Sequence, residues 1–132
     1  MEVPRILIAD DDADFKEILS AKLLAAGYEI AEAKDGAEAV TKARNLHPSL
    51  VIMDIQMPGV NGTEAVLELK SDPETKDIKM VFFSNLVYPW PAATKDNPEF
   101  AKELGAVTFL KKSDDLDEVV AKVKELVPIG LK

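Results

Sequence analysis

The sequence of 132 residues contains no cysteine. This absence excludes disulfide frameworks, cysteine zinc sites, iron–sulfur sites, thioredoxin-like redox motifs and cysteine proteases. Long apolar runs are also missing, because stretches such as Ile6-Leu7-Ile8-Ala9 and Met80-Val81-Phe82-Phe83 are far shorter than the roughly 20 residues that a membrane span needs. Met1-Glu2-Val3-Pro4 does not begin a signal peptide. We therefore expect a cytoplasmic protein that has no contact with a membrane.

Positive charge is scarce in this chain. Sixteen Lys and Arg residues stand against 24 Asp and Glu residues, which gives a net charge of −8. A negative protein repels a phosphate backbone, so we expect no direct nucleic-acid binding. The balance of 47% apolar and 30% charged residues is that of a folded globular protein. We expect one domain over residues 1–132, with no effector domain.

Short aliphatic runs alternate along the chain with longer stretches of helical spacing. This alternation is typical of βαβ units, which build a parallel sheet covered by helices. The predicted strands share a composition rich in branched aliphatic residues and cover residues 5–9, 28–33, 50–53, 79–83 and 107–110. The sequence therefore predicts an α/β fold with five strands.

Five helices are predicted from apolar residues spaced three or four positions apart. The first ends at Gly27, the second begins at the capping box formed by Asp35 and Glu38, and the others cover residues 63–70, 99–104 and a stretch after residue 115. The residues expected on the inner faces of the first, second and last helices are Phe15, Ile18, Leu19 and Leu23; Ala39, Val40, Ala43 and Leu46; and Leu116, Val119, Val120, Val123 and Val127.

Polar residues follow the predicted strands at the points where the strands end. They are Asp10-Asp11-Asp12, Asp54, Ser84 and Lys111-Lys112. In an open parallel sheet, ligands bind beyond the carboxyl ends of the strands. Two carboxylates about 5 Å apart repel each other by roughly 3 kcal/mol at an effective dielectric constant near 20, so such a group requires a cation. Oxygen ligands without His or Cys favour Mg²⁺.

These polar residues also have simpler structural interpretations. Asp12 and Asp14 are best interpreted as a cap and a favourable charge at a helix start. Asp10 and Asp11 follow an apolar strand, where an unpaired charge is costly, so we expect them to form a site. Alternation along the fifth strand does not decide between Lys111 and Lys112.

Four motifs, in this order, resemble the receiver domain of two-component response regulators. They are Ile6-Leu7-Ile8-Ala9-Asp10-Asp11-Asp12, the run from Val51-Ile52-Met53-Asp54 to Gly62, Phe82-Phe83-Ser84, and Gly105-Ala106 to Phe109-Leu110-Lys111-Lys112. The resemblance covers nearly the whole chain. It implies a flavodoxin-like, doubly wound parallel sheet with strand order 2-1-3-4-5 and five helices. It also implies a bound Mg²⁺ and transfer of a phosphoryl group from a histidine kinase or a phosphotransfer protein.

The same resemblance implies a role for each acidic residue of the site. Asp54 is the expected phosphoacceptor and Asp11 a direct metal ligand. Asp10 is expected to contact the metal through a water molecule, and the backbone carbonyl of Gln56 is expected to be a further metal ligand from the protein. Such a domain phosphorylates and dephosphorylates itself and is not a turnover enzyme.

The residues expected to respond to phosphorylation lie on the fourth and fifth strands. Ser84 is expected to bind the phosphoryl oxygens, and Phe109 to swing inward with it. Counting from Gly105-Ala106 assigns the family lysine to Lys112 and not to Lys111. Ser113 follows where the family usually has a proline in a cis peptide, so we expect that loop to be built differently. The movement of Ser84 and Phe109 would change the surface of the domain, and this change would signal to a downstream protein.

Two other hypotheses fit parts of the sequence. A haloacid-dehalogenase-like phosphatase would use Asp10 and Asp12, but the Thr or Val expected next is replaced by Ala13-Asp14, and Asp54 is left unexplained. A receiver-like module that binds proteins without being phosphorylated would lack an acid, the hydroxyl or the lysine. None of these is missing.

Overall fold

The computed structural model of the chain describes residues 3–54, 62–84, 108–111 and 115–129. Within these ranges the strands form one parallel sheet with the order β2-β1-β3-β4-β5. This confirms the predicted fold class. The strands are β1 (Arg5–Ala9), β2 (Glu29–Ala33), β3 (Leu50–Asp54), β4 (Lys79–Ser84) and β5 (Thr108–Lys111).

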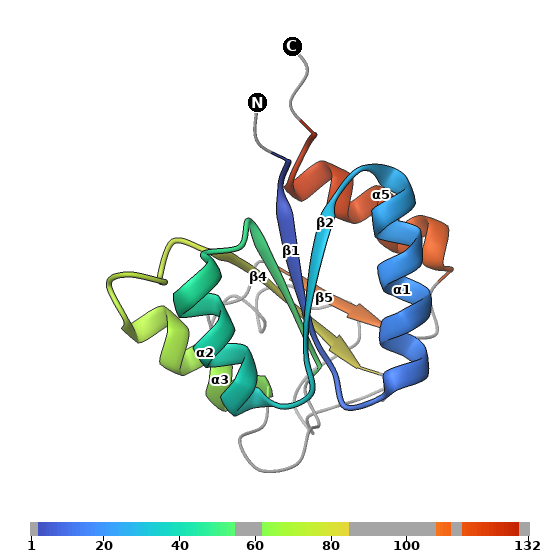
Figure 1. Cartoon of the computed structure of the whole chain (residues 1–132). Helices are drawn as coiled ribbons and strands as arrows, with labels where there is room; N and C mark the ends of the chain where they lie inside the picture. Colours follow the sequence, from blue (N-terminus) through green and yellow to red (C-terminus); the bar gives the residue numbers. More distant parts are fainter. Residues whose placement is uncertain (1–2, 55–61, 85–107, 112–114, 130–132) are drawn as a thin grey trace.

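Helices cover both faces of this sheet (Figure 1). The described helices are α1 (Ala13–Ala26), α2 (Gly36–Leu46), α3 (Gly62–Ser71) and α5 (Leu116–Leu126). The first and last pack together on one face, while α2 and α3 pack together on the other. None of the described helices is long and apolar enough to span a membrane. The helix predicted over residues 99–104 lies outside the described residues.

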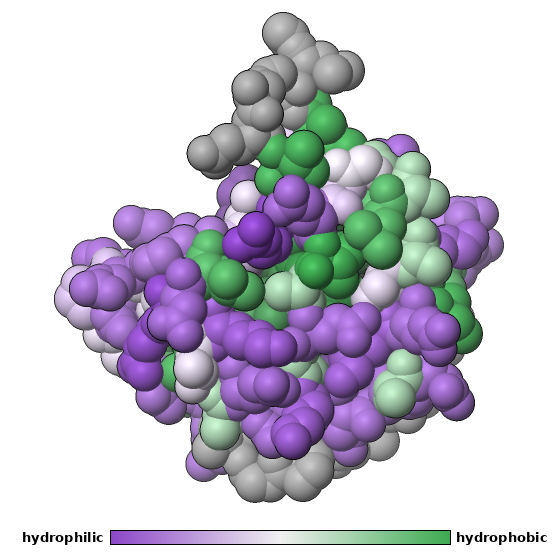
Figure 2. Space-filling model, viewed as in Figure 1, coloured by the Kyte–Doolittle hydropathy of each residue, from purple (hydrophilic) through white to green (hydrophobic). Residues whose placement is uncertain are grey.

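Two apolar cores fill the space between the sheet and the helices. Side chains alternate between the two faces of a strand, so neighbouring residues such as Phe82 and Phe83 enter different cores. The core under α2 and α3 contains Leu7, Val51, Met53, Met80 and Phe82, and the core under α1 and α5 contains Ile6, Ile8, Ile52, Val81 and Phe83. Hydrophilic residues cover most of the face shown in Figure 2, and apolar surface gathers towards the end of the sheet where β1 begins.

The predicted helix starts are confirmed by their capping hydrogen bonds. Asp12 is the N-cap of α1, where its Oδ1 accepts a 3.1 Å hydrogen bond from the backbone N–H of Phe15. Asp35 caps α2 by accepting a 2.8 Å bond from the N–H of Glu38. The Glu38 carboxylate accepts its return bond from the N–H of Lys34, one residue before the cap. Both helices therefore begin where the sequence places them.

Two residues predicted on inner helix faces are exposed instead. Ile18 is 52% exposed, because α1 buries Lys16, Leu19, Ser20 and Leu23, and Ile18 lies on the opposite side of that stripe. Leu46, the last residue of α2, is 36% exposed. The prediction was therefore wrong for Ile18 and Leu46. The fifth strand extends one residue beyond its predicted end at residue 110, and its predicted start at residue 107 lies outside the described residues.

Gly27 ends α1 in a conformation that favours glycine. Its φ of 109° lies in the left-handed region, and a Cβ built there would come within 2.9 Å of the Ile129 Cδ1 atom. We expect Gly27→Ala to lower the free energy of unfolding by about 1–2 kcal/mol, because an L side chain is strained at this φ. Urea unfolding measures this loss.

The control for this prediction is Leu24→Ala, which removes an exposed side chain from the last turn of the same helix. We expect that variant to lie within about 0.5 kcal/mol of the parent protein. An unchanged unfolding midpoint for Gly27→Ala would contradict the prediction.

Candidate functional site

Three carboxylates meet at the carboxyl edge of the sheet. Atoms of Asp10, Asp11 and Asp54 all lie within 4.8 Å of one another. β1 and β3 are neighbours, and the pairing of Ala9 with Met53 brings the next residues of both strands side by side. Asp10 is 2% exposed and Asp54 is 6% exposed, while Asp11 faces the solvent. The predicted convergence of these three acids is therefore confirmed.

Local hydrogen bonds fix the position of Asp10. Its backbone N–H donates a 3.0 Å hydrogen bond to the carbonyl oxygen of Ala33 at the end of β2. Its Oδ1 atom accepts a 2.9 Å bond from the backbone N–H of Asp12. Because Asp12 is also the N-cap of α1, the start of this helix and the Asp10 carboxylate are held in one turn of the chain.

The electrostatics of this cluster favour a small divalent cation. Carboxylates at such distances repel one another by roughly 3 kcal/mol per pair at an effective dielectric constant near 20. All three offer hard oxygen ligands. Mg²⁺ prefers oxygen ligands, takes one or two carboxylates and keeps several waters, and exposed Asp11 leaves room for those waters. The donor set therefore fits Mg²⁺.

The other predicted site residues are only partly within the described chain. The backbone of Ser84 ends β4 and pairs with Lys111, and Phe109 pairs with Phe82 in the same two strands. Gln56 and Lys112 lie outside the described residues. Their roles, and those of the Ser84 and Phe109 side chains, stay predictions.

One buried basic residue beside this edge of the sheet was missed by the sequence analysis. Lys16 is 9% exposed and donates a 3.4 Å hydrogen bond to the Ala33 carbonyl, which also accepts from Asp10 N–H. The signal was its spacing, because Lys16, Leu19 and Leu23 stand at i, i+3 and i+7 on the buried face of α1. A search restricted to apolar residues overlooks a lysine in such a stripe.

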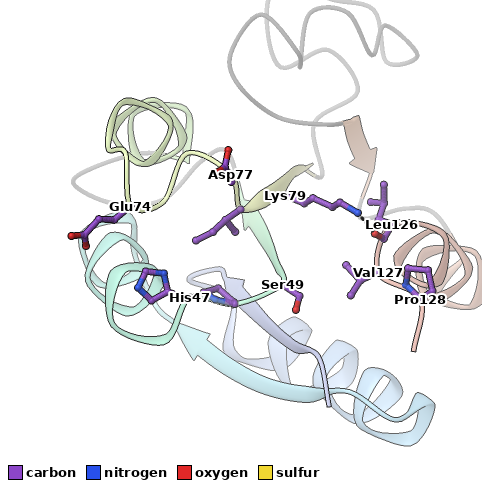
Figure 3. A pocket seen from close by; sticks show the side chains of 10 residues that line it. His47, Ser49, Glu74, Asp77, Lys79, Leu126, Val127 and Pro128 are labelled. Carbon is purple, nitrogen blue, oxygen red and sulfur yellow. Dashed lines mark hydrogen bonds between the residues drawn. The ribbon is translucent and has the colours of Figure 1, made fainter. Parts of the chain in front are cut away.

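A shallow pocket lies at the other end of the sheet (Figure 3). The pocket is lined by residues at the end of α2, just before β3, at the start of β4 and after α5, among them His47, Ser49, Lys79 and Pro128. The Lys79 amine already donates a hydrogen bond to the Leu126 carbonyl. Among the described residues, the amino ends of the strands carry no group of possible metal ligands comparable to Asp10, Asp11 and Asp54.

A family model described as the response regulator receiver domain matches residues 6–124. Among curated proteins, the transcriptional regulatory protein PrrA of Mycobacterium tuberculosis is 34% identical over 124 residues, which are 94% of this chain and 50% of PrrA. The DNA-binding dual master transcriptional regulator RpaA of Synechocystis is 32% identical over 95% of this chain and 49% of its own length. The chain thus spans about half the length of these two relatives.

Solved structures agree with the fold. The response regulator protein TrrA of Thermotoga maritima, solved in complex with Mg(2+)-BeF, is 33% identical and superposes with a TM-score of 0.78. The alignment covers 95% of this chain and 100% of TrrA.

Proposed function

Since this chain belongs to the response regulator receiver domain family, we propose that it accepts a phosphoryl group on Asp54 from a histidine kinase or a phosphotransfer protein. The observation that carries this proposal is the meeting of Asp10, Asp11 and Asp54 within 4.8 Å, at the ends of two neighbouring strands. We expect this site to hold Mg²⁺, and the similar response regulator protein TrrA was solved in complex with Mg(2+)-BeF. The reaction changes a surface for protein signalling and does not turn over a small substrate.

The chemistry follows from where the carboxylates lie. An oxygen of Asp54 forms a bond to phosphorus while the bond from phosphorus to the donor nitrogen breaks, and the leaving nitrogen takes a proton. Electrostatic repulsion opposes this reaction, because the attacking carboxylate and the phosphoryl group are both negatively charged. When held by Asp10 and Asp11, Mg²⁺ would supply positive charge that offsets this repulsion.

The residues of the chain do the positioning. Asp10 and Asp11 would hold the cation, with the Gln56 carbonyl as a further predicted ligand. Asp54 is 6% exposed, so few orientations are open to its carboxylate. Lys112 and Ser84 are predicted to bind the phosphoryl oxygens after transfer, and Phe109 to follow Ser84. The movement of these side chains would alter the surface of the domain, and a downstream protein would bind the altered surface.

The phosphatase alternative receives less support from the geometry. It needs Asp12 as a partner of Asp10, but the Asp12 carboxylate caps α1 and the three-acid cluster contains Asp54 in its place. The cytoplasmic location and the absence of direct nucleic-acid binding stay predictions. RpaA is named as a DNA-binding regulator and PrrA as a transcriptional one, and both are about twice as long as the region matched by this chain.

The test of the proposed function is incubation with a small acyl phosphate and Mg²⁺, read by intact mass. We expect the mass of one phosphoryl group to be added, in an acid-stable and base-labile form, and nothing to be added when the metal is chelated. Failure to accept phosphate from any donor would favour the module that binds proteins without phosphorylation. Phosphate turnover that requires Asp10 and survives the loss of Asp54 would favour the phosphatase.

Metal binding should also change stability. We expect Mg²⁺ at about 100 times its dissociation constant to raise the free energy of unfolding of the parent protein by about 2.7 kcal/mol. Asp11→Ala should be more stable than the parent without metal, because a repelling charge is removed, and it should lose most of the Mg²⁺ effect. Thermal unfolding with and without Mg²⁺ measures both effects.

Asp14→Ala is the matched control for this experiment. Asp14 is an exposed acid in the first turn of α1, outside the three-acid cluster. We expect this variant to keep the full Mg²⁺ effect. Equal Mg²⁺ shifts for Asp11→Ala and the parent would contradict metal binding at this cluster.

A further inference from the structure

Lys16 is the one positively charged side chain that is buried in the described part of the chain. It is 9% exposed. Within the described residues its ammonium group has one hydrogen bond, of 3.4 Å to the Ala33 carbonyl, and no salt bridge. Buried charges in proteins are normally paired, because an uncompensated ammonium group in a low-dielectric surrounding is costly. The position of Lys16 therefore needs an electrostatic explanation.

The helix does not provide that explanation. Lys16 is the fourth residue of α1, and its backbone N–H donates a 3.0 Å hydrogen bond to the carbonyl of Asp12, the N-cap. The start of a helix carries a partial positive charge, which disfavours a cation nearby. Both burial and the helix dipole thus oppose a lysine at this position.

The carboxylate cluster provides the opposite charge. The Ala33 carbonyl oxygen accepts from the Lys16 ammonium group at 3.4 Å and from the Asp10 N–H at 3.0 Å, so the two donors meet at one atom. Asp10 in turn belongs to the group of three acids within 4.8 Å. The ammonium group is therefore held next to the residue that joins β1 to this cluster.

We propose that Lys16 is a fixed counter-charge of the Asp10, Asp11 and Asp54 cluster, and that it sets how tightly the cluster binds a divalent cation. This inference rests on the proposed function. The ammonium group offsets part of the repulsion among the carboxylates when no cation is bound, and it repels a cation that enters. Lys16 is thus a positioning residue, which joins α1 to the end of β2 and limits metal affinity without touching the metal.

The test is calorimetric titration of the full chain with Mg²⁺. Lys16→Met keeps the length of the side chain and removes its charge. We expect this variant to bind Mg²⁺ about three- to tenfold more tightly than the parent, because the poorly screened repulsion between the ammonium group and the cation is lost. Lys16→Arg keeps the charge and should bind Mg²⁺ within about twofold of the parent. A role in packing alone would change stability and leave the affinity of Lys16→Met at the parent value.

Lys42→Met is the matched control. The Lys42 amine donates to the carbonyl of Glu32, next to Ala33, but the side chain is 38% exposed and pairs with Glu38. Because solvent screens this charge, we expect no change in Mg²⁺ affinity. Lys16→Gln provides a second neutral variant if Lys16→Met does not fold, as judged by circular dichroism.

The possible results separate this inference from the proposed function. If the parent binds Mg²⁺ and accepts phosphate while the neutral Lys16 variants bind Mg²⁺ with unchanged or lower affinity, the counter-charge inference is overturned and the proposed function stands. If the parent neither binds Mg²⁺ nor accepts phosphate, the proposed function fails and the inference fails with it.

Discussion

Asp54→Ala is expected to abolish phosphate uptake from an acyl phosphate, at every Mg²⁺ concentration. The reason is chemical, because alanine has no oxygen that can attack phosphorus, and Asp10 and Asp11 are expected to be held as metal ligands. Intact mass after incubation measures the effect directly. The variant should remain folded, because removing one of three mutually repelling carboxylates relieves strain in the metal-free protein.

Two variants make this result specific to Asp54. Asp54→Asn keeps the size of the side chain and should also take up no phosphate, so that a change in packing cannot explain the loss. Asp14→Ala removes an exposed acid of α1 and should be phosphorylated like the parent. Phosphate uptake by Asp54→Ala at the rate of the parent would assign the acceptor to another residue and overturn the proposal.

The acidic site was predictable because it depends on sheet topology and not on side-chain detail. Asp10 directly follows β1 and Asp54 is the last residue of β3, and in a parallel sheet the carboxyl ends of neighbouring strands lie at one edge. Once β1 and β3 are neighbours, the two acids are forced together. The resemblance to receiver domains supplied the strand order, which the spacing alone left open.

The error at Ile18 came from the details of α1. Periodicity placed Ile18 inside because it is apolar, but the buried face of α1 includes Lys16 and Ser20. Ser20 is satisfied there by a 2.7 Å hydrogen bond to the Glu32 carboxylate. The spacing of apolar residues does not reveal that a polar side chain is buried when its hydrogen-bond partner lies on a strand such as β2. The prediction therefore placed the inner face of α1 on the wrong side of the helix.

Phe83→Ala is expected to lower the free energy of unfolding by about 3–5 kcal/mol. The side chain is 1% exposed and belongs to the core under α1 and α5. Its ring also meets Phe15 of α1 edge to face, with ring centroids 5.1 Å apart and an angle of 80° between the planes. Such a loss is a large part of the roughly 5–15 kcal/mol that stabilises a typical domain. Urea unfolding followed by circular dichroism measures it.

Phe83 also connects the core to the site, because it pairs with Asp54 across β3 and β4 and directly precedes Ser84. The double variant of Phe15 and Phe83 to alanine should destabilise the protein less than the sum of the two single variants, by about 0.5–1.5 kcal/mol, because the ring contact is lost only once. Leu67→Ala is the control, since Leu67 is 46% exposed on α3 and its loss should cost about 0.5 kcal/mol or less. A Phe83→Ala variant as stable as Leu67→Ala would mean that α1 does not pack on β4 through these rings.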